Sequence, residues 1–164
     1  MSSNARFALL LLGSNINPDL HLKQGFQLLG EQFSIHAKSP IYQSPPVGAP
    51  GTSDYLNQAV TIDRPPVYES LRSQLRAIED QLGRIRTTDL NSPRTMDIDI
   101  LTYADEDLQM LLECPIDEAL KTLHHAAIPA SMIASDWRFP NDEKTIGEAS
   151  RSLGPAPTGF LTIS

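Results

Sequence analysis

The sequence has little cysteine, little positive charge and no long apolar run. Cys114 is the single cysteine among 164 residues, so no intramolecular disulfide can form, and a reducing, cytoplasmic location is expected. The longest apolar run, residues 7–12, is far shorter than the roughly 20 residues that cross a bilayer. Lys and Arg number 13 against 20 Asp and Glu, a formal net charge of -7. We therefore expect neither a membrane anchor nor a nucleic-acid partner.

The chain also shows no internal repeat and no low-complexity segment. A hydrophobic content of 40% is enough to build a core, and the length suits one domain, so we expect a single domain over 1–164. The last residues, 154–164, are rich in Pro, Gly, Ser and Thr, a composition that favours mobility. We expect a monomer, with a dimer as the alternative.

Hydrophobic spacing predicts elements in the order strand, helix, strand, strand, helix, strand. The strands are predicted over 5–13, 34–43, 55–63 and 96–101, and the helices over 21–33 and between Pro66 and Gly83. This order is that of a ferredoxin-like α+β domain, a βαββαβ antiparallel sheet with helices packed on one face. Weaker helical patterns over 115–123 and 144–153 are expected to be peripheral additions.

Two aspartates in the last predicted strand form the first candidate site. Asp97 and Asp99 are two residues apart, so both side chains emerge on the same face of the strand, about 6 to 7 Å apart. One interpretation is a solvated strand face. The other is a site for Mg²⁺, which takes one or two carboxylates and completes its shell with water and phosphate oxygens. Spacing alone does not decide between them.

Five arginines and no lysines form a basic cluster just before these aspartates. They are Arg72, Arg76, Arg84, Arg86 and Arg94. The planar guanidinium group matches the geometry of phosphate oxygens, which predicts a phosphate clamp close to the candidate metal ligands. The alternative is that the arginines only neutralise an acidic surface.

The loop and strand around 45–57 have a different composition. Pro45, Pro46 and Pro50 give rigid walls, Tyr55 gives an aromatic face, and Asn57 offers both an amide donor and an acceptor. This set suits a flat heterocycle, although packing and turn formation explain the same residues.

Several segments resemble the 6-hydroxymethyl-7,8-dihydropterin pyrophosphokinase family, which transfers pyrophosphate from ATP to a pterin alcohol in folate biosynthesis. SPRTMDIDI, residues 92–100, is similar to the family signature G-P-R-T-x-D-x-D-I, and LGRIR lies upstream of it as expected. LLGSN, YQSPPVGAPGTSDYLNQAV and FPN are further matches. The resemblance covers roughly 8–150 and implies a ferredoxin-like α+β fold.

The resemblance also implies roles for individual residues. Asp97 and Asp99 would bind two Mg²⁺ ions that bridge the phosphates of the co-substrate ATP, and Arg84 and Arg94 would be catalytic, holding the transferring group. The implied nucleotide contacts are Glu79, Arg86 and His125. The implied pterin contacts are Ser44, Pro45, Val47, Tyr55 and Asn57. In the implied reaction, the pterin hydroxymethyl oxygen attacks the β-phosphorus of ATP and AMP leaves.

The sequence departs from the family pattern in one important segment. From His124 to Pro129 the chain reads only HHAAIP, where the family usually has, after the second histidine, a longer stretch with an arginine for ATP and an aromatic that stacks on the pterin. A divergent relative that binds Mg-ATP or pterin but uses another substrate, or has lost catalysis, is therefore the main alternative. A plain regulatory module of the same fold is a further one.

Overall fold

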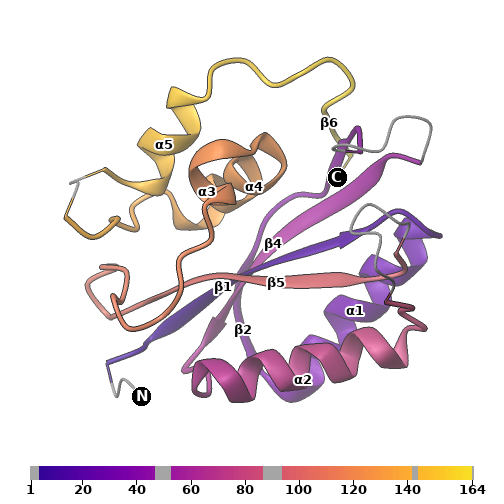
Figure 1. The fold of residues 1–164 in the computed structure, drawn as a ribbon, viewed down its shortest axis with the longest axis horizontal. Coiled ribbons are helices and arrows are strands. Elements are labelled where there is room, and N and C mark those ends of the chain that lie inside the picture. Colours follow the sequence, from indigo (N-terminus) through magenta and orange to yellow (C-terminus); the bar gives the residue numbers. More distant parts are fainter. Residues whose placement is uncertain (1–3, 47–52, 87–93, 142–143, 164) are drawn as a thin grey trace.

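The structure is a computed structural model that describes residues 4–46, 53–86, 94–141 and 144–163. Its elements are β1 (Phe7–Ser14), α1 (Pro18–Gln32), β2 (Ser34–Lys38), β3 (Tyr42–Ser44), β4 (Tyr55–Asp63), α2 (Tyr68–Gln81), β5 (Asp97–Ala104), α3 (Ala119–Thr122), α4 (His124–Ala134), α5 (Ile146–Ser152) and β6 (Leu161–Thr162) (Figure 1). Within those ranges, no helix has the length and apolar character needed to cross a membrane.

The strands form one antiparallel sheet in the order β5-β1-β4-β3-β6, with β2 also paired to β4. A mixed fold of helices and antiparallel sheet is confirmed, but the sheet is not the simple four-stranded ferredoxin-like arrangement. The segment 34–43, expected to be one strand, forms the two strands β2 and β3. Pro40 lies between them and lacks an N–H group for a sheet hydrogen bond. The C-terminal strand β6 pairs with β3 and adds a further strand at that edge of the sheet.

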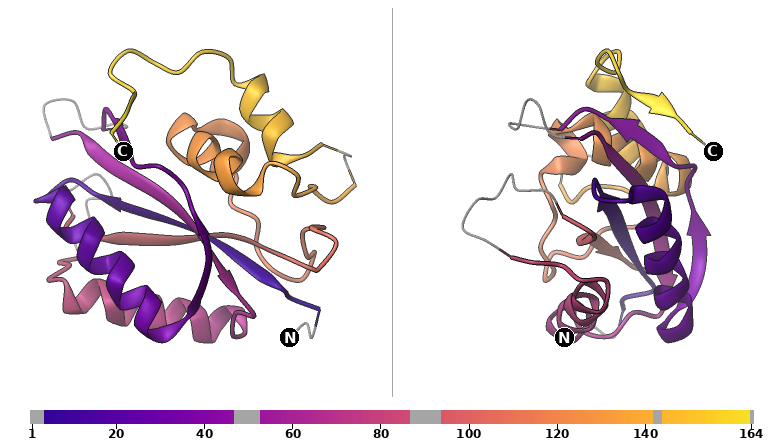
Figure 2. Two further views of the ribbon diagram at one scale, coloured as in Figure 1. Left: turned by 180° about the vertical axis from the view of Figure 1, so that it is seen from behind. Right: turned by 90° about the vertical axis from the view of Figure 1, so that its right-hand side faces the viewer.

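Helices cover both faces of this sheet, so the expectation of helices on one face is wrong. α1 and α2 lie against one face, and α3, α4 and α5 lie against the other (Figures 1 and 2). The reason is the central strand β1, which is buried at all eight positions. Its Leu10 and Leu12 enter the core under α1 and α2, whereas Leu9 and Leu11 enter the core under α3, α4 and α5. A strand that is apolar on both faces needs cover on both sides.

The C-terminal helices are therefore a full layer and not peripheral additions. Leu120, Ala126, Ala130, Trp137 and Ile146 are all buried in the second core. The helix α4 was not predicted because Pro129 lies inside it and its small alanines give no clear apolar stripe. The tail, whose composition favours mobility, contributes β6.

Replacing Leu120 with alanine is expected to lower the free energy of unfolding by about 2 to 5 kcal/mol, because the side chain is fully buried in the second core. Leu112 is 73% exposed and provides a matched control, for which the same substitution should cost less than about 0.5 kcal/mol. Urea unfolding followed by circular dichroism measures both values. If both substitutions changed the free energy of unfolding by equally small amounts, the layer of α3, α4 and α5 would contribute little to stability.

Candidate active site

The pairing of three strands places the two predicted substrate-binding groups in one row. Gly13 of β1 is directly opposite Asp97 of β5 on one side and Asn57 of β4 on the other. Directly opposed residues project to the same face of a sheet, so Asp97 and Asn57 share a face with a position between them that has no side chain. A Cβ atom on Gly13 would lie 2.9 Å from Asn57 Oδ1. Because Gly13 has no side chain, the surface of the sheet between Asp97 and Asn57 is unobstructed.

Two arginines hold the Asp97 carboxylate from different sides. Arg84 Nη1 donates to Asp97 Oδ1 at 3.2 Å and to the Met96 carbonyl oxygen at 2.9 Å. Arg94 Nη1 donates to Asp97 Oδ2 at 3.1 Å. Both guanidinium groups are largely shielded from solvent, with side-chain exposures of 13% and 17%. Shielding strengthens these interactions relative to exposed ion pairs.

The position of Arg94 depends on a residue that the sequence argument did not single out, Asn15. Its Oδ1 accepts a hydrogen bond from the Arg94 backbone N–H at 2.8 Å, and the Asn15 backbone N–H donates to the Arg94 carbonyl oxygen at 3.2 Å. Asn15 is buried and is the last residue of the LLGSN segment. A buried strand that ends in Gly-Ser-Asn was the available signal, but its partner is 79 residues away in the sequence.

Glu79 joins α2 to the outer edge of β5. Its Oε2 accepts from the Ile98 amide at 2.8 Å, and its Oε1 accepts from Arg86 Nη2 at 2.6 Å and lies 3.6 Å from Arg84 Nη1. Burial raises the pKa of Glu79, and the Ile98 hydrogen bond opposes that rise. Arg86 is also bonded to Asp80. Glu79 therefore orients both Arg84 and Arg86.

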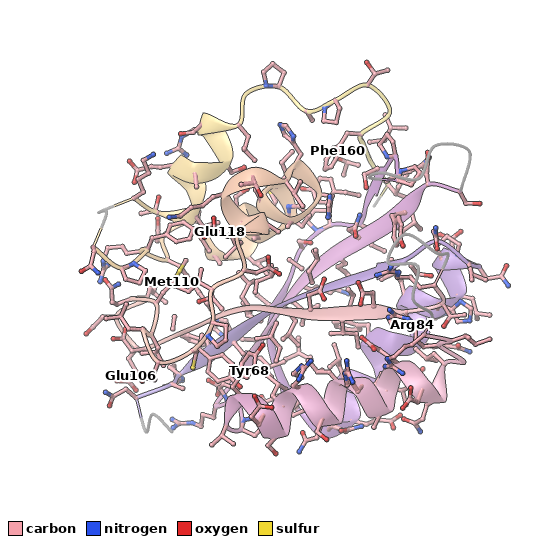
Figure 3. The ribbon with its side chains drawn as sticks, in the orientation of Figure 1. Tyr68, Arg84, Glu106, Met110, Glu118 and Phe160 are labelled. Atoms are coloured by element: carbon pink, nitrogen blue, oxygen red, sulfur yellow. The ribbon has the colours of Figure 1, made fainter. Side chains whose placement is uncertain are left out.

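These groups border a polar cavity of about 490 Å³ between α2 and β5. Figure 3 shows Tyr68 at the beginning of α2 and Arg84 beyond its end. The lining includes all five arginines of the cluster together with Glu79, Asp97, Asp99 and Asp117. Arg72 and Arg76, which the sequence left open as surface residues, therefore face the same space. The cavity combines guanidinium groups with carboxylates, as a site for a phosphate chain and a cation requires.

The carboxylates in this cavity suit a metal ion that is shared with a ligand. Partial removal from water and repulsion by Asp97, Asp117 and Glu79 raise the pKa of Asp99 to about 7. A cation beside Asp97 and Asp99 would relieve this surplus of negative charge. In the described part of the chain, no group of three or more His, Cys, Asp or Glu is arranged to hold a metal. Two carboxylates fit Mg²⁺ that takes its remaining ligands from water and phosphate.

A second, smaller cavity of about 220 Å³ lies on the other side of the row. It is lined by Ser44, Pro45, Pro46, Thr122, Leu123, His124, His125, Pro157 and Phe160. Ser44 Oγ accepts a hydrogen bond from Asn57 Nδ2 at 3.1 Å, and both residues are buried. Tyr55 is directly opposite Ser44, so the predicted pterin contacts Ser44, Pro45, Tyr55 and Asn57 come together. Val47, the remaining predicted contact, lies outside the described residues.

His125 belongs to the smaller cavity, which it lines together with Ser44 and Pro45. Among the described residues, it is not part of the lining of the polar cavity. Burial lowers the pKa of His125, and the negative charges of Asp117 and Asp97 partly oppose this change. The imidazole is therefore uncharged at neutral pH and near enough to Asp97 to respond to its charge.

Comparison with known sequences identifies relatives over most of the chain. The model of the family 7,8-dihydro-6-hydroxymethylpterin-pyrophosphokinase (HPPK) matches residues 9–135. A 2-amino-4-hydroxy-6-hydroxymethyldihydropteridine pyrophosphokinase of Synechocystis sp. is 32% identical over 142 residues, covering 85% of this chain and 72% of the relative. The enzyme of the same name from Haemophilus influenzae is 30% identical over 146 residues, covering 83% and 86%.

Solved structures show the same fold. Wild-type Plasmodium falciparum HPPK-DHPS with pteroate matches with a TM-score of 0.67 and 12% identity over 93% of this chain. This chain spans 45% of the length of that protein. The family model covers well over half of the chain, and the two curated relatives match over most of their own length. The chain therefore belongs to the 7,8-dihydro-6-hydroxymethylpterin-pyrophosphokinase family.

Proposed function

We propose that this chain transfers the pyrophosphoryl group of ATP to the hydroxymethyl oxygen of 6-hydroxymethyl-7,8-dihydropterin and releases AMP. Family membership makes it an ATP-dependent pyrophosphokinase of folate biosynthesis. The observation that carries the proposal is the row Asp97, Gly13, Asn57 across the sheet. It supports the reaction because Asp97, which lines the polar cavity, and Asn57, which is bonded to Ser44 of the smaller cavity, share one face of the sheet with no side chain between them.

The polar cavity would hold the phosphate chain of ATP. Arg84 and Arg94 are already held near Asp97, so they need little rearrangement to bind phosphate oxygens. They would stabilise the negative charge that shifts during transfer, and Arg86 and Glu79 would complete the nucleotide contacts. The overall charge of -7 makes this local basic cluster the main attraction for a polyanion.

Asp97 and Asp99 would hold Mg²⁺, and we propose two ions. When bound, Mg²⁺ neutralises phosphate charge and helps to align the reacting groups. The chain's own part is to keep both carboxylates on one face, two residues apart, with Asp97 fixed by Arg84 and Arg94. This arrangement favours a metal that enters together with ATP, since phosphate oxygens supply the missing ligands.

The smaller cavity would hold the pterin. The Asn57 amide would bind the polar edge of the ring, Ser44, Pro45 and Val47 would contribute backbone contacts, and Tyr55 would flank the ring. His125 lines the smaller cavity, near enough to Asp97 to respond to its charge, and would donate a hydrogen bond to a phosphate oxygen from the pterin side. The hydroxymethyl oxygen would then face the β-phosphorus across Gly13.

We also propose that the sheet is a ferredoxin-like variant. Its second strand is divided into β2 and β3, and β6 is added outside β3. We propose that the protein acts as one domain over 1–164 and as a monomer.

The direct test is AMP formation from Mg-ATP with and without the pterin, comparing the wild type with Asp97→Asn. Pterin-dependent AMP formation should fall about 100-fold or more in the variant, because a carboxylate ligand is lost and Arg84 and Arg94 lose their anchor. Asp63→Asn is a matched control, since Asp63 is equally exposed and pairs with Arg6 at 2.7 Å far from the site. Equal rates in the two variants would refute the metal assignment, and a wild type without pterin-dependent AMP would refute the reaction.

Asn57→Ala is expected to raise the KM for the pterin about tenfold while leaving the KM for ATP unchanged, because the amide is lost only on the pterin side. Gln58→Ala provides the control. Gln58 is also buried and bonds the Ser39 carbonyl oxygen through its amide, but as the next residue of the strand it projects to the opposite face. Steady-state kinetics with each substrate varied separately measures both. An unchanged pterin KM in Asn57→Ala would remove this residue from the site.

Gly13→Ala is expected to impair pterin binding and turnover but to spare ATP binding. Its new Cβ would lie 2.9 Å from Asn57 Oδ1, so Asn57 must move and its bond to Ser44 is disturbed. Gly30→Ala is the control, because the nearest atom to its Cβ, on Ile35, is 4.0 Å away. Calorimetric titration with pterin and with a non-hydrolysable ATP analogue separates the two effects. Full pterin affinity in Gly13→Ala would show that the site does not need a position without a side chain between Asp97 and Asn57.

A further inference from the structure

The C-terminal segment, residues 154–163, returns across the molecule to the sheet edge beside the proposed pterin cavity (Figure 1). Its strand β6 pairs with β3 in the register Tyr42↔Thr162 and Gln43↔Leu161. The Ile163 amide also donates to the Ile41 carbonyl oxygen at 2.7 Å. β3 ends at Ser44, one of the cavity residues. The segment is therefore attached to the strand that carries one wall of the cavity.

Close contacts hold the rest of the segment over the same cavity. Gly159 has a φ of +91°, and a Cβ placed on it would lie 3.2 Å from Cγ of Pro45, so the backbone passes directly against this proline. The Phe160 ring packs on the Tyr42 ring with 5.6 Å between centroids. At the other end, His124 Nε2 lies 3.4 Å from the Gly154 carbonyl oxygen. The segment thus joins the beginning of α4 to β3.

Phe160 and Pro157 complete a cavity that three separate parts of the chain enclose. The first part is Ser44 to Pro46, the second is Thr122 to His125, and the third is the C-terminal segment. Figure 3 shows Phe160 between α4 and the paired strands β3 and β6. The lining is mostly flat or apolar: proline rings, imidazoles and a phenyl ring. Its polar groups are the Ser44 and Thr122 hydroxyls and the two imidazoles, and Ser44 is bonded to the buried Asn57.

We propose that the C-terminal segment is part of the substrate site and that Phe160 is a specificity-determining residue that contacts the pterin ring. This inference rests on the proposed function. A flat, uncharged heterocycle with one polar edge matches a cavity walled by rings, with Ser44 at one side and Asn57 bonded to Ser44 behind it. Phe160 supplies aromatic surface that the shortened segment after His125 does not.

The C-terminal segment lies outside the part of the chain that the family model matches. The family model matches residues 9–135, and the C-terminal segment lies entirely beyond that match. The contact with Pro45 and the pairing with β3 connect it to residues inside the match. The segment therefore adds a wall to a site whose other parts belong to the family domain.

The test compares Phe160→Ala and Phe160→Leu with the wild type in pterin-dependent AMP formation. Loss of the ring should raise the KM for the pterin about three- to tenfold in both variants and leave the KM for ATP unchanged. Phe160→Leu keeps most of the apolar volume, so it remains informative if the alanine variant fails to fold. Phe160→Tyr keeps the ring and should retain the wild-type pterin KM.

Leu161→Ala is the matched control, because Leu161 follows Phe160 directly and is 54% exposed. It should leave both KM values unchanged. A wild-type pterin KM in a folded Phe160→Leu variant would overturn the proposal. If the wild type forms no pterin-dependent AMP, the proposed reaction fails. Equilibrium dialysis then tests directly whether Phe160 contributes to binding of the pterin. Weaker binding to Phe160→Leu than to the wild type would support this contribution, and equal or absent binding would refute it.

Discussion

The pairing of β1 with β4 on one side and β5 on the other is the constraint on which the site depends. It places Asp97, Gly13 and Asn57 in one row, so the carboxylate that we propose binds the metal and the amide that we propose binds the pterin are two strands apart. Neighbouring strands of a sheet are separated by about 4.8 Å, which leaves room for a hydroxymethyl group to approach a phosphate across a position without a side chain. A one-residue slip in either pairing would turn Asp97 or Asn57 to the wrong face.

Electrostatics explains why the two cavities differ. The polar cavity holds carboxylates and guanidinium groups in contact, and three of its arginines have an acidic partner: Arg84 and Arg94 pair with Asp97, and Arg86 pairs with Glu79 and Asp80. These pairs keep the cations in position before ATP binds, so less reorganisation is needed during transfer. The smaller cavity has few charged groups, and burial keeps His125 uncharged at neutral pH. A neutral heterocycle can therefore enter it without removing a charge from water.

The sequence predicts local features of the site better than distant ones. Period-two spacing placed Asp97 and Asp99 on one face, and the structure puts Ile98 and Ile100 in the opposite core. The strand over 55–63 is confirmed at both ends. The contact between Asn15 and Arg94 was not predicted, because it depends on strand pairing over 79 residues. The second helical layer was also missed, since Pro129 hides α4 and the double-sided burial of β1 becomes clear only in the sheet.

The site is assembled from segments that are far apart in the sequence, and each segment is fixed by the core and not by the site itself. Gly13 ends the central strand, Glu79 belongs to a helix buried against the sheet, and Arg94 is held by the buried Asn15. Bringing Asp97, Asp99 and Glu79 together costs free energy, which the raised pKa values of Asp99 and Glu79 reflect. The surrounding core must offset this cost. The two-sided apolar core around β1 provides that stability. The proposed cation and phosphate chain would relieve the repulsion among these carboxylates on binding.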